Sequence, residues 1–172
     1  MKDYFDEFKK YLIEDKKASS NTVESYLRDA SQFFSYCASL NINDTAAVDQ
    51  KLLLKYMDYL TVLGKSEATK NRIVATLRCY YRFLNSKKIV SENPVDAIKV
   101  KKVEKKLPGI LDSNEIILLL AQPSGTDYKS VRDKAMLEVM YATGIRVSEL
   151  IELDIDDVNI EQGIIKCNSL KK

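Results

Sequence analysis

The chain has 172 residues, of which 45% are hydrophobic, so it can form one folded domain or two small ones. No apolar run reaches about 18 residues and the start MKDYFDEFKK is charged, so we expect neither a membrane span nor a signal peptide. Three widely spaced cysteines without a CxxC pair are typical of reduced thiols in a cytoplasmic protein.

The formal net charge of +2 conceals an uneven distribution. Residues 1–106 contain 20 basic and 14 acidic residues, whereas residues 107–172 contain 7 and 11. Within residues 63–106 the basic excess is 12 against 4. This local excess indicates either a face that meets a polyanion or a solvated, lysine-rich linker.

The first half of the chain is predicted to form a helical bundle. Apolar residues at spacings of three and four predict helices over residues 4–13, 22–37, 49–63 and 67–85. In the first helix Phe5, Phe8, Leu12 and Ile13 have this spacing. Ser20 or Asn21 is the predicted N-cap of the second helix, and Gly64 is predicted to end the third.

The fourth predicted helix has an apolar and a polar stripe. The apolar stripe, expected to be buried, consists of Ile73, Leu77, Tyr80, Tyr81 and Leu84. The opposite stripe consists of Asn71, Ala75, Arg78 and Arg82, flanked by Lys70 and Arg72. The small Ala75 would allow a flat partner to approach this polar side closely.

A lysine-rich connection containing Pro94 and Pro108 follows, and its composition is typical of an extended linker. We therefore expect two domains, residues 1–106 and 107–172. In the second, helices are predicted over residues 113–122, 128–143 and 147–153, with Gly144 ending the middle one. The N-cap of the first of these helices is predicted to be Asp112 or Ser113, and the middle helix is largely apolar. A change to alternating apolar residues then predicts a β-hairpin that turns near Gln162 and Gly163.

Three stretches resemble the tyrosine recombinases, the phage-integrase and Xer family. YATGIRVSELIELDIDDVNIEQGIIK is similar to the segment around the first catalytic arginine of that family. KKASSNTVESYLRDASQFFSYC resembles the start of its helical core-binding domain, and SEATKNRIVATLRCYYRFLNSKKIVSENPVDAIKVKKVEKKLPGILD resembles the last helix and linker. The resemblance implies a mainly α fold: a four-helix SAM-like domain, a linker, and the helical and β-hairpin start of an α+β catalytic domain.

The resemblance also implies a function. Family members clamp double-stranded DNA, assemble as tetramers on two DNA sites, and take no small-molecule substrate. They cut without a metal or cofactor: a tyrosine attacks a phosphodiester and forms a 3′-phosphotyrosyl link. Two arginines, a lysine and a histidine-type partner steady the phosphate and move protons.

By motif, Arg146 corresponds to the first of these arginines and Glu149 to a residue that orients the active-site helix. A planar guanidinium stays protonated and can bind two non-bridging oxygens of a phosphorane at once. The alternative from the residues alone is an arginine that caps a helix or pairs with Glu149, in surroundings that look buried.

Other parts of the catalytic set are missing or ambiguous. Lys171 or Lys172 in NSLKK corresponds to the catalytic lysine, although both fit equally well as solvated lysines. The chain has no histidine, and its ten tyrosines lie at or before Tyr141. Tyr26, Tyr80 and Tyr81 are predicted to be core or core-edge residues. We therefore expect this chain to correspond to the front portion of a recombinase and not to cleave DNA alone.

DNA contacts carried over from the family fall on two helices and the linker. These are Ser20, Asn21 and Thr22 at the start of the second helix, Lys70, Asn71, Arg72, Arg78 and Arg82 on the fourth, and Lys101 and Lys102 in the linker. Each could instead be a solvated polar residue. Two further interpretations remain: a non-enzymatic DNA-binding protein that competes with a full-length enzyme, or a helical protein-interaction module whose basic face is incidental.

Overall fold

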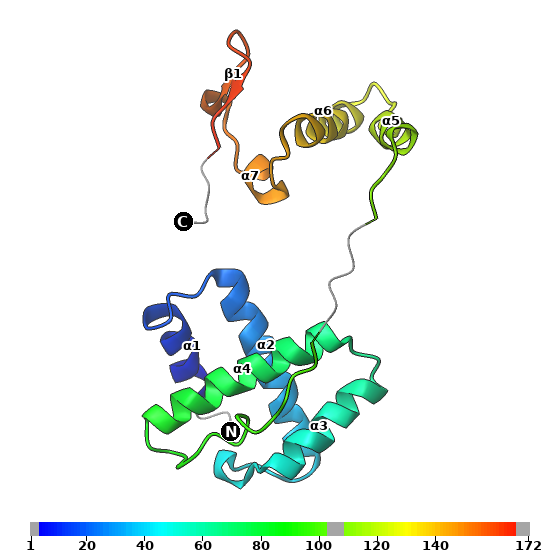
Figure 1. Ribbon diagram of the computed structural model, residues 1–172. Helices are drawn as coiled ribbons and strands as arrows, with labels where there is room; N and C mark the ends of the chain where they lie inside the picture. Colours follow the sequence, from blue (N-terminus) through cyan, green and yellow to red (C-terminus); the bar gives the residue numbers. More distant parts are fainter. Residues whose placement is uncertain (1–3, 103–108, 168–172) are drawn as a thin grey trace. The chain divides into compact units, whose positions relative to one another are not determined.

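The computed structural model of the chain describes residues 4–102 and 109–167. The chain divides into two compact units, residues 1–105 and 106–172, and each is described by itself (Figure 1). Both units are built mainly from helices, as the sequence predicted.

The described part of the first unit is built from α-helices and a short 3₁₀ turn. They are α1 (Phe5–Glu14), α2 (Ser20–Ser39), η2 (Thr45–Ala47), α3 (Gln50–Val62) and α4 (Glu67–Ser86). α2 and α4, with 20 residues each, are the longest of these and pack against each other. Gly64 adopts a φ of +70° just after α3, so the chain reverses there without the steric cost that a Cβ would bring.

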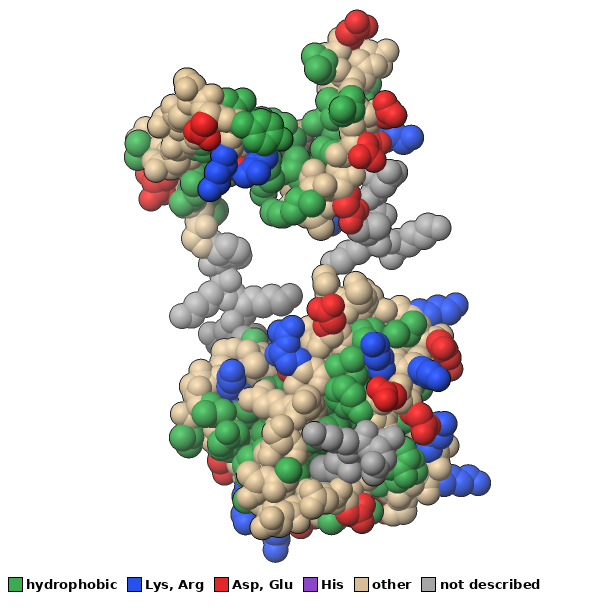
Figure 2. All heavy atoms as spheres, turned by 180° about the vertical axis from the view of Figure 1, so that it is seen from behind, with side chains coloured by type: hydrophobic (Ala, Val, Ile, Leu, Met, Phe, Trp, Pro, Cys, Tyr) green, Lys and Arg blue, Asp and Glu red, His purple; other side chains and the backbone are tan. Residues whose placement is uncertain are grey.

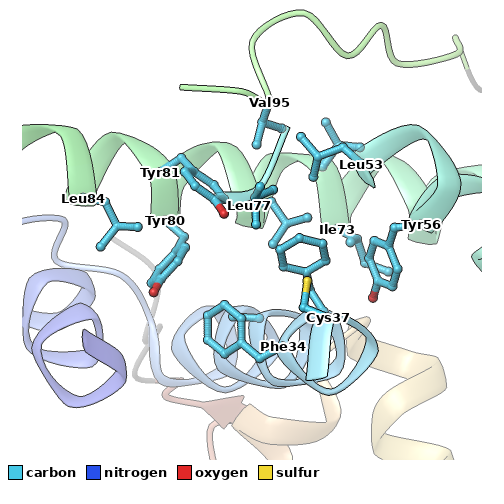
Figure 3. Close-up of a cluster of buried hydrophobic side chains, with 14 of the residues drawn as sticks. Phe34, Cys37, Leu53, Tyr56, Ile73, Leu77, Tyr80, Tyr81, Leu84 and Val95 are labelled. Carbon is cyan, nitrogen blue, oxygen red and sulfur yellow. The ribbon is translucent and has the colours of Figure 1, made fainter. Parts of the chain in front are cut away.

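The core of the first unit lies where α1, α2, α3 and α4 meet (Figure 3). The predicted stripe of α4 is confirmed, because Ile73, Leu77, Tyr80, Tyr81 and Leu84 are all buried. Phe34 of α2 packs against Tyr80 with 5.1 Å between ring centroids. Ile13 of α1 is 49% exposed, so its predicted place on the inner stripe is wrong. Tyr26 lies at the core edge, as expected.

The chain turns back after α4. Residues 90–101, which we call the exit segment, run back along α4 toward its amino-terminal end (Figure 1). Val90, Val95 and Ile98 of this segment are buried and belong to the core of the first unit. The exit segment is therefore part of the helical unit and not an extended linker along its whole length.

The described part of the second unit contains short helices and a hairpin. The elements are α5 (Ser113–Ala121), α6 (Tyr128–Thr143), α7 (Val147–Ile151), η3 (Ile155–Asp157), β1 (Val158–Asn159) and β2 (Ile164–Ile165). Asp112 is the N-cap of α5, and Gly144 ends α6 with a φ of +67°. The two strands are antiparallel, with Val158 opposite Ile165.

The second unit has little buried apolar surface within its described residues. Ile145 is the only hydrophobic residue buried there. Apolar side chains lie on the surface of this unit (Figure 2). The large exposed ones on α5, α6, α7 and the hairpin include Ile117, Leu118, Tyr128, Val131, Tyr141, Ile151 and Ile160. The prediction that Arg146 lies in buried surroundings is therefore wrong.

Candidate nucleic-acid interface

The predicted contact residues on α2 lie at its first turn. Ser19, and neither Ser20 nor Asn21, is the N-cap: its Oγ accepts a hydrogen bond from the Thr22 amide at 3.4 Å and lies 2.9 Å from Thr22 Oγ1. The predicted cap is wrong by one residue because the helix begins earlier than its apolar stripe. Ser20 and Asn21 are exposed and Thr22 is half-buried.

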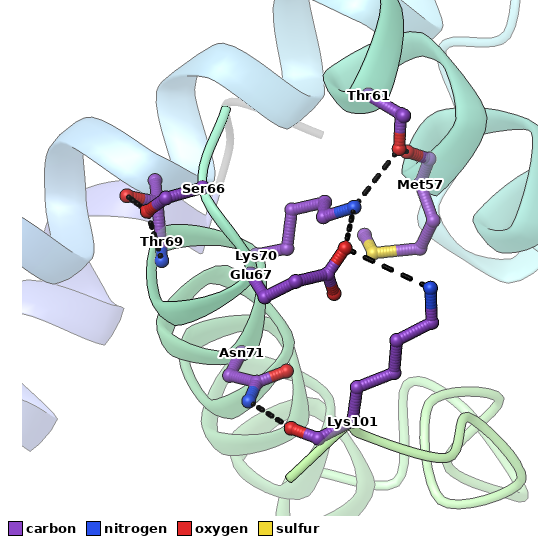
Figure 4. A network of polar contacts seen from close by, with 8 residues as sticks. All are labelled: Met57, Thr61, Ser66, Glu67, Thr69, Lys70, Asn71 and Lys101. Atoms are coloured by element: carbon purple, nitrogen blue, oxygen red, sulfur yellow. Dashed lines mark hydrogen bonds and ion pairs between the residues drawn. The ribbon is translucent and has the colours of Figure 1, made fainter. Parts of the chain in front are cut away.

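Lys70 lies in a polar network at the start of α4 (Figure 4). Its side chain is only 10% exposed, and its Nζ donates to Thr61 Oγ1 of α3 at 3.0 Å and pairs with Glu67. Glu67 also pairs with Lys101 Nζ at 3.7 Å. The hydrogen bond from Lys70, together with the charge of Lys101, holds the pKa of Glu67 below its usual value. The predicted place of Lys70 on an exposed polar side is therefore wrong.

Arg72 is held by a buried carboxylate between α2 and α4. Its Nη1 donates to Oδ2 of Asp29 at 2.8 Å, and Thr76 Oγ1 donates to the same oxygen at 3.1 Å. Burial raises the pKa of Asp29, and the Arg72 charge and these two hydrogen bonds offset this effect only in part. The Arg72 side chain is 42% exposed, so its remaining N–H groups can reach an external anion.

Two other predicted contact residues of α4, Asn71 and Arg78, bond to the exit segment. Asn71 Nδ2 donates to the carbonyl of Lys101 at 2.7 Å, and Arg78 Nη2 donates to the carbonyl of Ile98 at 3.1 Å. The backbone of Lys101 is thus fixed, while the side chains of Lys101 and Lys102 are exposed. These polar residues of α4 serve an internal role that their stripe in the sequence did not reveal.

A basic hollow of about 420 Å³ lies between the first turns of α2 and the middle of α4. Its polar lining consists of Lys16, Thr22, Tyr26, Arg78 and Arg82, with Ala75 and Cys79 beside them. Within the described residues, Arg82 makes no ion pair or hydrogen bond with another side chain, so its charge is available to a ligand. We call these lining residues the basic groove.

Sequence reasoning missed two residues of the basic groove, Lys16 and Tyr26. Lys16 precedes the Ser19 cap in the polar break KKASS, and its Nζ lies 5.6 Å from the centre of the Tyr11 ring. The pair Lys16 and Lys17, just before a helix cap, was the feature of the sequence that could have indicated this basic site. Tyr26 was assigned to the core edge alone, and burial raises the pKa of its hydroxyl.

Arg146 is the N-cap residue of α7 and its side chain is 63% exposed. Its Nη1 donates to Oε1 of Glu149 at 2.7 Å, and its backbone N–H donates to Oε2 at 3.0 Å. These hydrogen bonds, the backbone one first, lower the pKa of Glu149. The pairing with Glu149 that the sequence left open as an alternative is therefore present, and the Arg146 side chain is mostly exposed to solvent.

A hollow of about 410 Å³ lies next to this pair, between the α6–α7 junction and the hairpin. Its lining includes Thr143, Gly144, Glu149 and Ile165. The two candidates for the catalytic lysine, Lys171 and Lys172, lie outside the described residues.

Two family models match the chain, one over the first unit and one over the second. The model of the phage integrase N-terminal SAM-like domain matches residues 5–88, and the model of the phage integrase family matches residues 110–172. The chain belongs to the phage integrase family of tyrosine recombinases.

Similar proteins match nearly all of the chain. It is 40% identical over 166 residues to a protein of Caldanaerobacter subterraneus subsp. tengcongensis described as a tyrosine recombinase, and the match covers 96% of the chain and 57% of that protein. It is 32% identical over 166 residues to tyrosine recombinase XerD of Staphylococcus epidermidis, covering 96% and 56%. The crystal structure of XerA recombinase aligns with 98% of the chain and 55% of its own, at 23% identity and a TM-score of 0.47. The chain thus spans about half the length of its curated relatives.

These matches favour neither the competing DNA-binding protein nor the helical interaction module as the function of the chain. In the part of the chain that the structure describes, no helix has the length and apolar character needed to cross a lipid bilayer.

Proposed function

We propose that this chain binds double-stranded DNA in the cytoplasm as part of a tyrosine recombinase, acting in site-specific recombination or integration. Residues 1–106 form the DNA-binding domain in this proposal, and residues 107–172 begin the catalytic domain. Membership of the family and the basic groove between α2 and α4 together support it. No cofactor or small-molecule substrate is part of this function.

The basic groove supplies the groups that a DNA backbone needs. Lys16 and Arg82 offer positive charge, and Thr22 offers a hydroxyl beside the first turn of α2. Most protein–DNA hydrogen bonds go to phosphates, which fix the position of the protein on the duplex. Ser20 and Asn21 at the same turn, Arg72 through its free N–H groups, and the Lys101 and Lys102 side chains complete the proposed contact surface.

In this proposal Arg146 binds the phosphodiester that is to be cut. Glu149 holds the guanidinium in place until a phosphate replaces the carboxylate, so Glu149 acts as a positioning residue. A fixed guanidinium stabilises charge that develops on phosphoryl oxygens, and such donors typically contribute about 100- to 1000-fold in rate. Lys171 or Lys172 would supply the catalytic lysine, and assembly into tetramers on two DNA sites belongs to the same proposal.

Salt-dependent binding tests the central claim. The affinity of the chain for a mixed-sequence DNA duplex of about 40 base pairs is measured by fluorescence anisotropy at several salt concentrations. If about five phosphates are neutralised, log K falls against log salt with a slope of about −4 to −5. Arg82→Ala should make the slope less steep by about one unit, whereas Lys51→Ala, an exposed lysine of α3 outside the groove, should leave it unchanged. A flat salt dependence in the unchanged chain would refute DNA binding.

A further inference from the structure

One edge of α4 carries polar residues at a seven-residue spacing: Asn71, Arg78 and Asn85. Seven residues make nearly two turns of an α-helix, so these three side chains lie in one row along the axis. The rest of the basic groove on α4 uses the neighbouring edge of the helix, where Ala75, Cys79 and Arg82 lie, and Arg78 borders both edges. The polar side of α4 is therefore divided into two edges.

Each residue of this row donates to backbone carbonyls of the exit segment. The bonds run from Asn85 Nδ2 to Val90 O at 3.2 Å and Ser91 O at 2.8 Å, from Arg78 Nη2 to Val95 O at 3.5 Å and Ile98 O at 3.1 Å, and from Asn71 Nδ2 to Lys101 O at 2.7 Å. The order of the acceptors is the reverse of the order of the donors. The exit segment consequently lies antiparallel to α4 from residue 90 to residue 101, and Figure 4 shows its last bond, from Asn71 to Lys101.

Further contacts fix the middle of the same segment. Asn93 Nδ2 donates back to the carbonyl of Arg78 at 3.3 Å, and Arg78 Nε pairs with Asp96 at 3.3 Å. The Arg78 side chain is only 27% exposed. Its Nη2 and Nε already face two carbonyls and a carboxylate, so Arg78 serves the exit segment first and only its Nη1 group remains for a phosphate.

We propose that Asn71, Arg78 and Asn85 are positioning residues that fasten the exit segment to α4 and so shorten the connection between the two units. With the segment fastened, ten residues separate Lys101 from Asp112, the N-cap of α5. With the segment released, the connection would begin after Ser86, at the end of α4, and include 25 residues. At about 3.5 Å per residue, the maximal reach grows from about 35 Å to about 90 Å.

This inference rests on the proposed function, because the connection matters only if both units contact one duplex. The effective concentration of a tethered unit falls roughly as the −3/2 power of tether length. An increase from 10 to 25 residues therefore lowers it by about four-fold. The row of three donors thus sets how strongly the second unit reinforces the binding of the first.

Limited proteolysis tests the fastening without any DNA. Trypsin cleavage after Lys99 and Lys101 under native conditions is followed by mass spectrometry for Asn71→Ala, Arg78→Ala and Arg82→Ala. The loss of one hydrogen bond in Asn71→Ala should speed cleavage by about two- to ten-fold, and the loss of charged bonds in Arg78→Ala by about ten-fold or more. Arg82→Ala removes the same charge as Arg78→Ala from the neighbouring edge and should leave the rate unchanged.

Equal cleavage rates in all three variants and the unchanged chain would overturn the fastening. Asn71→Ala keeps every charge and alters a half-buried surface residue, so it remains informative if Arg78→Ala fails to fold.

DNA affinity tests the positioning role. Asn71→Ala frees the exit segment only as far as the buried Ile98, so the connection grows from 10 to 13 residues. Its affinity for the duplex of about 40 base pairs should fall by about 1.5-fold, with an unchanged salt slope and an unchanged thermal midpoint. Faster cleavage with unchanged affinity would overturn the positioning role while leaving the fastening intact. If the unchanged chain binds no DNA, the proposed function fails, whereas the proteolysis result still decides whether the segment is fastened.

Discussion

The first unit buries an apolar stripe from each of its four helices, whereas the described helices of the second unit leave theirs largely exposed. Leu77 of α4 is fully buried, and Leu118 of α5 is 62% exposed. The residues that begin and end helices are nevertheless present in both units. Ser19 caps α2, Asp112 and Glu115 form a capping box at α5, and Gly144 ends α6 in the left-handed conformation.

The comparison separates what forms a helix from what stabilises a unit. Caps and glycine stops satisfy backbone groups within a few residues of sequence, and each contributes about 1 kcal/mol. Burial of a large apolar side chain contributes about 1.5–3 kcal/mol and needs a second surface. An isolated helix of the length of α5, nine residues, is marginal in water. We therefore expect the free energy of unfolding to reside mainly in the first unit.

The largest difference in stability is expected between two matched variants, Leu77→Ala in the first unit and Leu118→Ala in the second. Removal of the fully buried Leu77 side chain should cost about 2–5 kcal/mol, because it leaves a cavity in the core. The same substitution at Leu118 should change stability by less than about 0.5 kcal/mol, since that side chain is mostly exposed. Urea unfolding followed by circular dichroism measures both. Similar losses would mean that the second unit has a core equal to that of the first.

A smaller loss of stability is expected when the N-cap of α2 is removed. Ser19→Ala removes the side chain that accepts from the Thr22 amide and should cost about 0.5–2 kcal/mol of unfolding free energy. Ser20→Ala, one residue later and exposed, is the matched control and should change stability by less than about 0.5 kcal/mol. Urea midpoints of the two variants decide between the observed cap and the cap predicted from sequence. A larger loss in Ser20→Ala would reverse the assignment.

Helical periodicity predicted the helices and the buried stripe of α4, because the apolar residues of a packed helix recur every three to four positions. It could not predict what covers the other faces. Asn71 and Arg78 form a polar row in the sequence whether they meet solvent, DNA or their own chain, and here they meet the exit segment. Lys70 was misplaced for the same reason, since its partner Thr61 comes from another helix.

The candidate site was predictable to a different extent in each unit. Arg146 was proposed from its motif, and its contact with Glu149 follows from their three-residue spacing on one helix turn. The basic groove was only partly found, because Lys16 and Tyr26 join it through packing of α1 and α2 against α4. Spacing within one element is visible in a sequence, whereas a groove between elements depends on tertiary contacts.

The pH dependence of stability should differ in sign between one carboxyl group of the first unit and one of the second, and this effect is the weakest of those expected. Burial raises the pKa of Asp29 in the first unit, and hydrogen bonds from Arg146 lower the pKa of Glu149 in the second. Folded Asp29 binds its proton at higher pH than the unfolded chain does, so its contribution to stability falls as pH rises from 3.8 through the raised pKa. Glu149 contributes stability above its usual pKa of 4.5, and this contribution is lost as pH falls through the lowered pKa.

The variants Asp29→Asn and Glu149→Gln test these opposite pH dependences of stability. Each variant loses one titration, so the pH dependence of its stability difference from the unchanged chain reports that carboxyl group alone. Between about pH 3 and pH 6, the advantage of the unchanged chain over Asp29→Asn should shrink as pH rises, whereas its advantage over Glu149→Gln should grow. The offset caused by leaving Arg72 without its partner is constant with pH and does not affect the slope. Urea midpoints across this range measure both slopes, and slopes of the same sign would show that Asp29 is not governed by burial, removing this contrast between the two units.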